Sequence, residues 1–195
     1  MAEFIRRVVT GHDKNGKAIV LSDGPATAVR INLNRPGHKS TDIWKTTAMP
    51  VPISREEPDP TQGLRDFVPV NGTKIRISEI GPEPEAFRSL TPEQVRAFFK
   101  EGGNESASTF NEGGRHPFMH RTESVDYAVV LEGEITMLLD DQDVVLKAGD
   151  IVIQRGTNHA WSNRSGKLVR MLYILIDGRF EPELAAFSKP RAERG

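Results

Sequence analysis

The 195-residue sequence contains no cysteine, no long apolar run and no marked excess of charge of either sign. Without cysteine the chain can form neither a disulfide nor a thiolate metal site, so any bound metal needs nitrogen or oxygen ligands. No window approaches the roughly 20 apolar residues of a membrane-spanning helix, and residues 1–10 lack a signal-peptide core. We therefore expect a soluble cytoplasmic protein.

The charge balance limits the classes of partner. The sequence has 26 Lys and Arg against 27 Asp and Glu, a net charge of −1, and these charges are interspersed. A nucleic-acid or anionic-membrane surface would need a basic stripe, and none is present. We expect a small-molecule ligand, with no nucleic acid and no membrane as partner.

The N-terminal half is predicted to be extended and irregular. Residues 4–10 and 18–22 are typical of a hairpin, and residues 73–80 (TKIRISEI) alternate as a half-buried strand does. Between them the many prolines exclude long helices and central strands. Residues 1–90 are therefore interpreted as a hairpin and an arm that contribute strands to a larger β-domain. Because an isolated hairpin is only marginally stable, we expect the arm to pair two chains as a homodimer.

One short helix is predicted at residues 91–103. Thr91 is a good N-cap, Gln94 stands at the capping-box position, and Gly102–Gly103 are expected to end the helix. Residues 104–180 then form the core of the domain, and 181–195 form a tail. The core consists of short β-rich runs separated by tight polar turns, a pattern typical of a sandwich or a small barrel.

Two segments of this core resemble the motifs of the cupin superfamily. Asp126 is followed after six residues by Gly133, as at the end of the first cupin motif, although the family usually has Glu in place of this Asp. Gly149–Asp150, residues 154–159 and Asn163 resemble the second motif, and its metal-ligand position falls on His159. The resemblance covers roughly residues 116–177. It implies an all-β fold, a double-stranded β-helix (jelly-roll) barrel with an N-terminal strand arm and one short helix.

The sequence departs from these motifs at three positions. The second motif is one residue short before Gln154, and Gln154 replaces the usual proline. The first motif normally has two histidines two residues apart. Here His120 occupies the first place and Thr122 the second.

The resemblance implies a divalent transition metal held by His120, Asp126 and His159. The spacing is compatible with this set, because residues 120, 122 and 126 share a face if the segment is extended. Two histidines and a carboxylate suit Fe(II), and also Zn, Mn, Ni or Co. His116, four residues upstream, is an alternative third nitrogen ligand.

Further candidates would bind the substrate. Trp161 alternates with His159 and is expected to wall the cavity, Gln154 or Arg155 would orient an anionic group, and Thr122 would face the ligand. Two functions follow. The first is a metal-dependent enzyme acting on a small carboxylate or aromatic substrate, with dioxygenase chemistry favoured over decarboxylase, isomerase, lyase or hydrolase chemistry. The alternative is a non-catalytic binding or regulatory cupin. Metal analysis separates the two.

Overall fold

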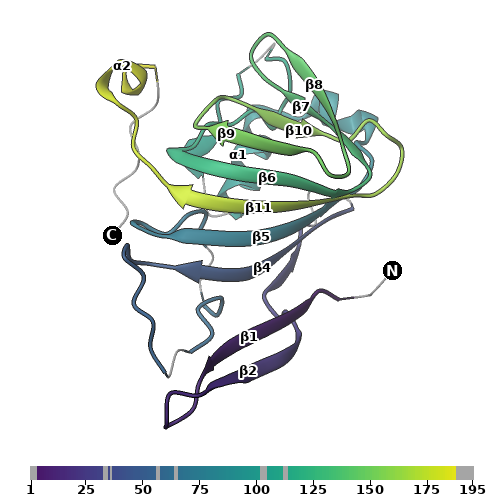
Figure 1. Ribbon diagram of the computed structural model, residues 1–195. Helices are drawn as coiled ribbons and strands as arrows, with labels where there is room; N and C mark the ends of the chain where they lie inside the picture. The colour runs from purple at the N-terminus through teal and green to yellow at the C-terminus, as the bar shows by residue number, and fades with distance from the viewer. Residues whose placement is uncertain are drawn as a thin grey trace.

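Two antiparallel sheets, packed face to face, form the body of the protein (Figure 1). The computed structural model describes residues 4–32, 35, 37–55, 58–63, 66–101, 105–111 and 114–187. The large sheet has six strands, in the order β3 (Val29–Ile31), β4 (His38–Thr46), β5 (Thr73–Ile80), β11 (Val169–Asp177), β6 (Ser124–Glu132) and β9 (Ile151–Arg155). The small sheet has three, in the order β10 (Ala160–Ser162), β7 (Glu134–Leu138) and β8 (Asp143–Lys147). The predicted all-β barrel is confirmed.

The main hydrophobic core lies between these two sheets. Alternate residues of β6 are buried while their neighbours face outwards, as expected of a strand with one face on a core. The core draws its buried side chains from both sheets, and they are Ile80, Ala128, Val130, Ile135, Met137, Leu146, Trp161, Val169 and Met171. The tight β6–β7 connection depends on Gly133, whose φ is 84° and where a Cβ atom would lie 2.9 Å from the carbonyl oxygen of Leu168.

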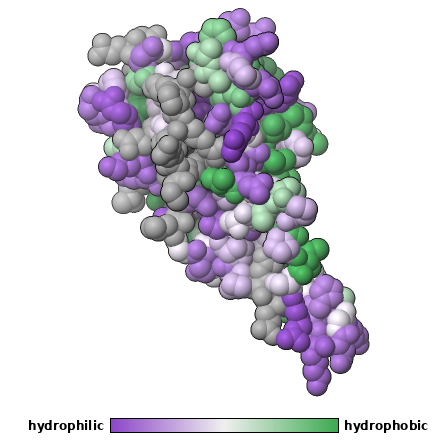
Figure 2. Space-filling view, turned by 90° about the vertical axis from the view of Figure 1, so that its left-hand side faces the viewer, coloured by the Kyte–Doolittle hydropathy of each residue, from purple (hydrophilic) through white to green (hydrophobic). Residues whose placement is uncertain are grey.

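The arm joins the barrel through β4 and β5. These strands pair from Thr46 opposite Thr73 to His38 opposite Ile80, and β5 then pairs with β11. The hairpin of β1 (Arg6–His12) and β2 (Ala18–Pro25) instead forms a sheet of its own and projects from the barrel, so the molecule narrows towards this end (Figures 1 and 2).

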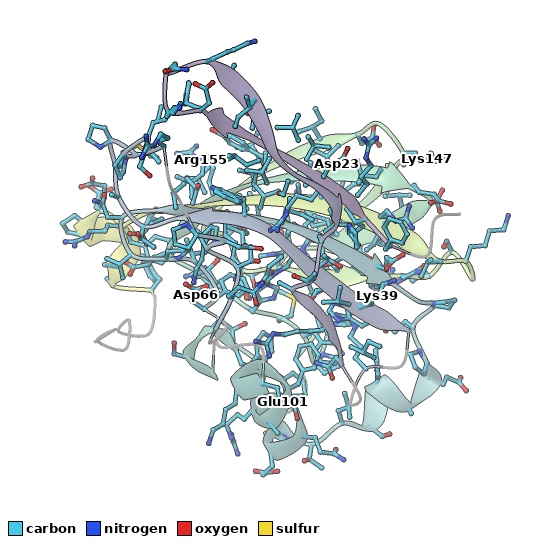
Figure 3. All side chains as sticks on the ribbon, turned by 90° about the horizontal axis from the view of Figure 1, so that it is seen from below. Asp23, Lys39, Asp66, Glu101, Lys147 and Arg155 are labelled. Atoms are coloured by element: carbon cyan, nitrogen blue, oxygen red, sulfur yellow. The ribbon has the colours of Figure 1, made fainter. Side chains whose placement is uncertain are left out.

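Three of the helices gather on one side of the sheets (Figure 3). They are η1 (Glu85–Ser89), α1 (Pro92–Glu101) and η2 (Glu105–Ala107), and Figure 3 labels Glu101 at the end of α1. The predicted capping box is present: the Thr91 amide donates to Gln94 Oε1 at 2.9 Å, and the Gln94 amide donates to Thr91 Oγ1 at 3.3 Å. The predicted end at Gly102–Gly103 lies outside the described residues.

The helical segment has a hydrophobic core of its own. It consists of Phe87, Val95, Phe99, Ala107 and Phe118. A further four-residue helix that the sequence did not predict, α2 (Pro182–Ala185), lies in the C-terminal tail, of which residues 188–195 are outside the described part. No helix in the described ranges is long and apolar enough to cross a membrane.

Candidate functional site

A cavity of about 450 Å³ lies inside the barrel, next to the helical segment. Aromatic rings form much of its wall, and they belong to Phe67, Phe98, Phe99, Phe118, Trp161 and Tyr173. Its polar lining includes Arg35, Arg76, His120, Asp126, Gln154 and His159. A concave, largely apolar space with a few polar groups is the usual form of a small-molecule site.

His120 and His159 form a close pair in this cavity. Their backbones exchange two hydrogen bonds of 2.9 Å, which form an isolated β-bridge that links the segment before β6 to the segment before β10. As a result the two imidazole rings lie 4.2 Å apart between centroids, at an interplanar angle of 45°. The two predicted histidines, 39 positions apart in the sequence, are therefore brought together by the fold.

Backbone carbonyls fix the orientation of both rings. Nδ1 of His120 lies 2.9 Å from the carbonyl oxygen of Phe118, and Nδ1 of His159 lies 3.0 Å from that of Thr157. A carbonyl oxygen only accepts, so Nδ1 of His120 carries the proton and its Nε2 keeps its lone pair. Metal-bound histidines are commonly held in this way. The side-chain amide nitrogen of Gln154, which only donates, is also 3.0 Å from Nδ1 of His159, so the contacts of His159 are compatible with a proton on either ring nitrogen. The same nitrogen lies 2.6 and 2.7 Å from the carbonyl and hydroxyl oxygens of Thr157.

Burial keeps the two histidines neutral. It lowers the pKa of His120 to about 4, and it lowers the pKa of His159 well below the usual value, with a further contribution from the charge that His120 would carry. Neutral imidazole is the form that ligates a metal, so at neutral pH both rings are ready to do so.

Asp126 lies on β6 with its side chain in the same cavity, and it is only 5% exposed. Its Oδ1 atom is buried and has no hydrogen-bond partner among the described residues. Burial raises the pKa of Asp126 to about 7, against the smaller opposing effects of the Ser124 hydroxyl and the Arg76 charge. Gln154, its register partner on β9, has an equally buried and unpartnered Oε1 atom. An unsatisfied acceptor pair of this kind is costly in a fold and points to a ligand.

The types of potential ligand atom in the cavity suit a divalent transition metal. These atoms are two neutral imidazole nitrogens and one unpartnered carboxylate oxygen, all lining one cavity. Within the described part of the chain, however, no three His, Asp or Glu side chains lie close enough together to hold a metal ion. The structure therefore provides two ligands already adjacent, and Asp126 as the carboxylate that would complete the set.

The alternative ligand His116 is engaged elsewhere. Its Nε2 lies 3.1 Å from Glu83 Oε2, and its Nδ1 accepts the backbone N–H of Phe118 at 3.1 Å. Glu83 also accepts a hydrogen bond of 2.6 Å from the hydroxyl of Ser162. Both ring nitrogens of His116 are thus used in holding the loop to the barrel, and His116 does not line the cavity.

The four predicted substrate contacts divide equally. Trp161 and Gln154 line the cavity, whereas Thr122 and Arg155 do not. Arg155 is exposed, because it alternates with the buried Gln154 on β9. Thr122 is buried, and its hydroxyl is 2.8 Å from that of Ser124. The shared-face argument does not hold for Thr122, since residues 121–123 are not part of a strand and β6 begins only at Ser124.

Sequence reasoning missed several polar residues of the cavity, among them Arg35, Arg76 and Tyr173. Arg35 comes from the arm, and it donates to the carbonyl of Trp161 at 3.2 Å while its guanidinium carbon lies 4.8 Å from the centre of the Phe118 ring. Burial lowers the pKa of Arg35 to about 10, so it remains a cation at neutral pH. The alternating strand at residues 73–80 contained a signal for Arg76, but the isoleucines were the more obvious inward face.

Comparison with known proteins identifies the family. The pattern of the Cupin domain family matches residues 107–175. The cupin-domain-containing oxidoreductase fogC of Aspergillus ruber is 30% identical over 175 residues, which cover 88% of this chain and 71% of that protein. The chain belongs to the cupin superfamily. Phomopsin biosynthesis cluster protein C' of Diaporthe leptostromiformis is 48% identical over 68 residues, or 34% of this chain, and this match spans only 36% of that relative's length. The cupin-domain-containing oxidoreductase virC of Hypocrea virens is 38% identical over 63 residues, which cover 30% of this chain and 32% of that protein.

Proposed function

We propose that this cupin is a metal-dependent enzyme that converts a small organic carboxylate or aromatic substrate inside the barrel. The observation that carries the proposal is the histidine pair: His120 and His159 are buried and neutral, their ring centroids are 4.2 Å apart, and the Nε2 lone pair of His120 is left to bind. Asp126 supplies the carboxylate. This two-histidine, one-carboxylate set is typical of sites that keep open coordination positions for substrate or oxygen.

Different residues of the cavity would bind the metal, orient its ligands and bind the substrate. His120, His159 and Asp126 would hold the metal, which when bound would supply Lewis-acid or oxygen-activating chemistry. The carbonyl of Phe118 would keep His120 in the ligating tautomer. The aromatic wall excludes bulk water and receives the apolar part of the substrate.

The names of the relatives support an oxidoreductase rather than a lyase or isomerase. Of the three relatives described above, two are called cupin-domain-containing oxidoreductases and one is named for a biosynthesis cluster. For this chain we propose only the class of reaction, which is an oxidation or oxygenation of a small molecule. A fold shared with many chemistries cannot narrow the reaction further.

Metal analysis of protein purified without a histidine tag tests the proposal. We expect close to one equivalent of a transition metal in the wild type, and its loss in both His159→Ala and Asp126→Ala. His12→Ala, which removes an exposed histidine of the hairpin, is the matched control and should keep the metal. Less than about a tenth of an equivalent, unchanged after reconstitution, would overturn the proposal.

One observation favours the second candidate, a metal-free binding cupin. The described residues hold no ready group of three ligands, and Thr122 stands in the place of the second motif histidine. In that case the same cavity would bind its ligand without turnover. The metal analysis above distinguishes the two functions directly.

We also propose that the protein is a homodimer. The projecting hairpin exposes several large apolar side chains, which are Val8, Ile19, Val20 and Leu21. Among the described residues, the hairpin is held to the rest of its own chain by the Arg7–Asp59 ion pair and by a hydrogen bond from Arg7 to the carbonyl of Ile43. Light scattering should give twice the mass of one chain, and a monomeric mass across micromolar concentrations would contradict the proposal.

A further inference from the structure

Arg76 lines the cavity and has one guanidinium nitrogen without a hydrogen-bond partner among the described residues. It lies in the middle of β5, and its side chain is 9% exposed. Its Nε donates to Asp42 Oδ1 at 2.8 Å, and its guanidinium carbon lies 5.6 Å from the centre of the Phe67 ring. Its Nη2 atom is buried without a hydrogen-bond partner among the described residues. A buried guanidinium N–H without an acceptor is strongly unfavourable unless a ligand supplies one.

Among the described residues, the ion pairs behind Arg76 compensate only part of the positive charge of its cluster. Asp42 is shared, since its second oxygen lies 2.9 Å from Lys74 Nζ, and Lys74 also contacts Asp66 at 3.0 Å. Asp66, labelled in Figure 3, is in turn 3.1 Å from Lys45. Three cations thus share two carboxylates, which leaves one net positive charge. Arg76 is the cation of this group that lines the cavity, so the excess charge faces the ligand space.

Asp126, a carboxylate of the same cavity, does not form an ion pair with Arg76 among those of the described residues. Its own Oδ1 is also unpartnered. The cavity therefore contains a cationic donor and a separate carboxylate, each with unused hydrogen-bonding capacity.

We propose that Arg76 binds the carboxylate of an aromatic or similarly apolar organic acid, and so determines the substrate class of this cavity. The Nη2 atom and the surplus positive charge match a carboxylate. The rings of Phe67, Trp161 and Tyr173 match an apolar body, and the volume of about 450 Å³ is that of a small-molecule site. Asp42 holds the guanidinium from behind, so that the anion meets a fixed donor. The inference rests on the proposed function in one respect, that this cavity is the substrate site.

Binding of matched acids and amides tests the inference. The probes are benzoate and trans-cinnamate, each against its neutral amide, measured by calorimetry on the full-length protein as purified and after metal removal. We expect the wild type to bind at least one acid more tightly than its amide. Arg76→Gln should weaken binding of that acid by about 10- to 100-fold and leave amide binding within about twofold. The matched control is Arg170→Gln, which alters an arginine–carboxylate pair of the same sheet outside the cavity and should bind as the wild type does.

A second variant covers the case in which Arg76→Gln does not fold. Arg76→Lys keeps a charge beside Asp42 but has no planar fork, and it should weaken acid binding by at least about fivefold. Failure of every acid to bind the wild type at millimolar concentration, or equal binding by wild type and the Arg76 variants, would overturn the inference. If the protein takes up no metal but binds the acid in a manner that depends on Arg76, the metal proposal is refuted and the inference about Arg76 stands. Full metal content with acid binding independent of Arg76 would refute the inference alone.

Discussion

Asp42 and Asp126 are two buried carboxylates on the same six-stranded sheet, and their surroundings are opposite. Asp42 has a cation on each oxygen, Arg76 on one and Lys74 on the other. Asp126 has an oxygen with no hydrogen-bond partner among the described residues. Burial opposes ionisation of both groups, but the two cations outweigh it at Asp42 and hold its pKa below the usual range. At Asp126 burial prevails, and the pKa rises to about 7. Burial alone therefore does not mark a functional carboxylate, whereas missing partners do.

The largest effect on stability is expected from removing Asp42, the carboxylate that pairs with both Lys74 and Arg76. Asp42→Ala leaves the buried charges of Lys74 and Arg76 without their shared partner. The free energy of unfolding should fall by about 3–5 kcal/mol, as is typical when one member of a buried ion pair is removed. Urea denaturation of wild type and variant gives this difference. A loss below about 1 kcal/mol would mean that the cluster is not structural.

The Asp42→Ala variant also tests how the stability contribution of Asp42 depends on pH. Because the pKa of Asp42 is lower in the folded state, its stabilising contribution is present above its unfolded pKa of about 4 and is lost as the pH falls through the folded value. The stability difference between wild type and Asp42→Ala should be constant from about pH 5 to 8 and shrink below about pH 4. Denaturation curves across this range provide the measurement, and a difference that grows on acidification would contradict the sign.

A smaller loss of stability is expected at His116, whose two ring nitrogens both have hydrogen-bond partners. His116→Ala removes one partner of Glu83, which keeps its hydrogen bond from Ser162. We expect the unfolding free energy to fall by about 1–3 kcal/mol and the metal content to stay unchanged. Loss of metal without loss of stability would show that His116 is the ligand after all.

The smallest effect on stability is expected at Asp126, whose Oδ1 atom has no hydrogen-bond partner among the described residues. Asp126→Asn is nearly isosteric and removes a buried charge that has no ion-pair partner among the described residues. In metal-free protein its stability should lie within about 1 kcal/mol of the wild type, or above it. Metal binding should nevertheless be lost. Calorimetric unfolding after metal removal tests the first statement, and a loss similar to that of Asp42→Ala would remove the distinction between the two carboxylates.

The sequence predicted the barrel and the histidine pair because both depend on local patterns. Turns at Gly133 and Gly149 delimit the short strands, and the second motif places His159. It predicted Trp161 in the cavity because Trp161 alternates with His159. It offered Gln154 and Arg155 as alternatives, and the structure places Gln154 there. It placed Thr122 and Arg155 there wrongly, since neither the irregular segment at 121–123 nor the outer face of β9 was evident.

Arg76 could not be predicted from amphipathic pattern alone. On β5 the polar residues Lys74, Arg76 and Ser78 point into the barrel, while Ile75 and Ile77 are only half-buried on the other face. The usual rule assigns the isoleucines to the core. The inversion is stable because Asp42 and Asp66, from segments distant in the sequence, compensate most of the charge. Only the three-dimensional structure shows those partners.

Anomalous scattering at the transition-metal edges of a crystal of the full-length protein tests the central claim most directly. The account predicts one peak in the barrel cavity, within about 2.0–2.2 Å of Nε2 of His120, Nε2 of His159 and a carboxylate oxygen of Asp126. A crystal reconstituted with iron, zinc, manganese and nickel that shows no peak there would contradict it. So would a peak bound by His116 and Glu83.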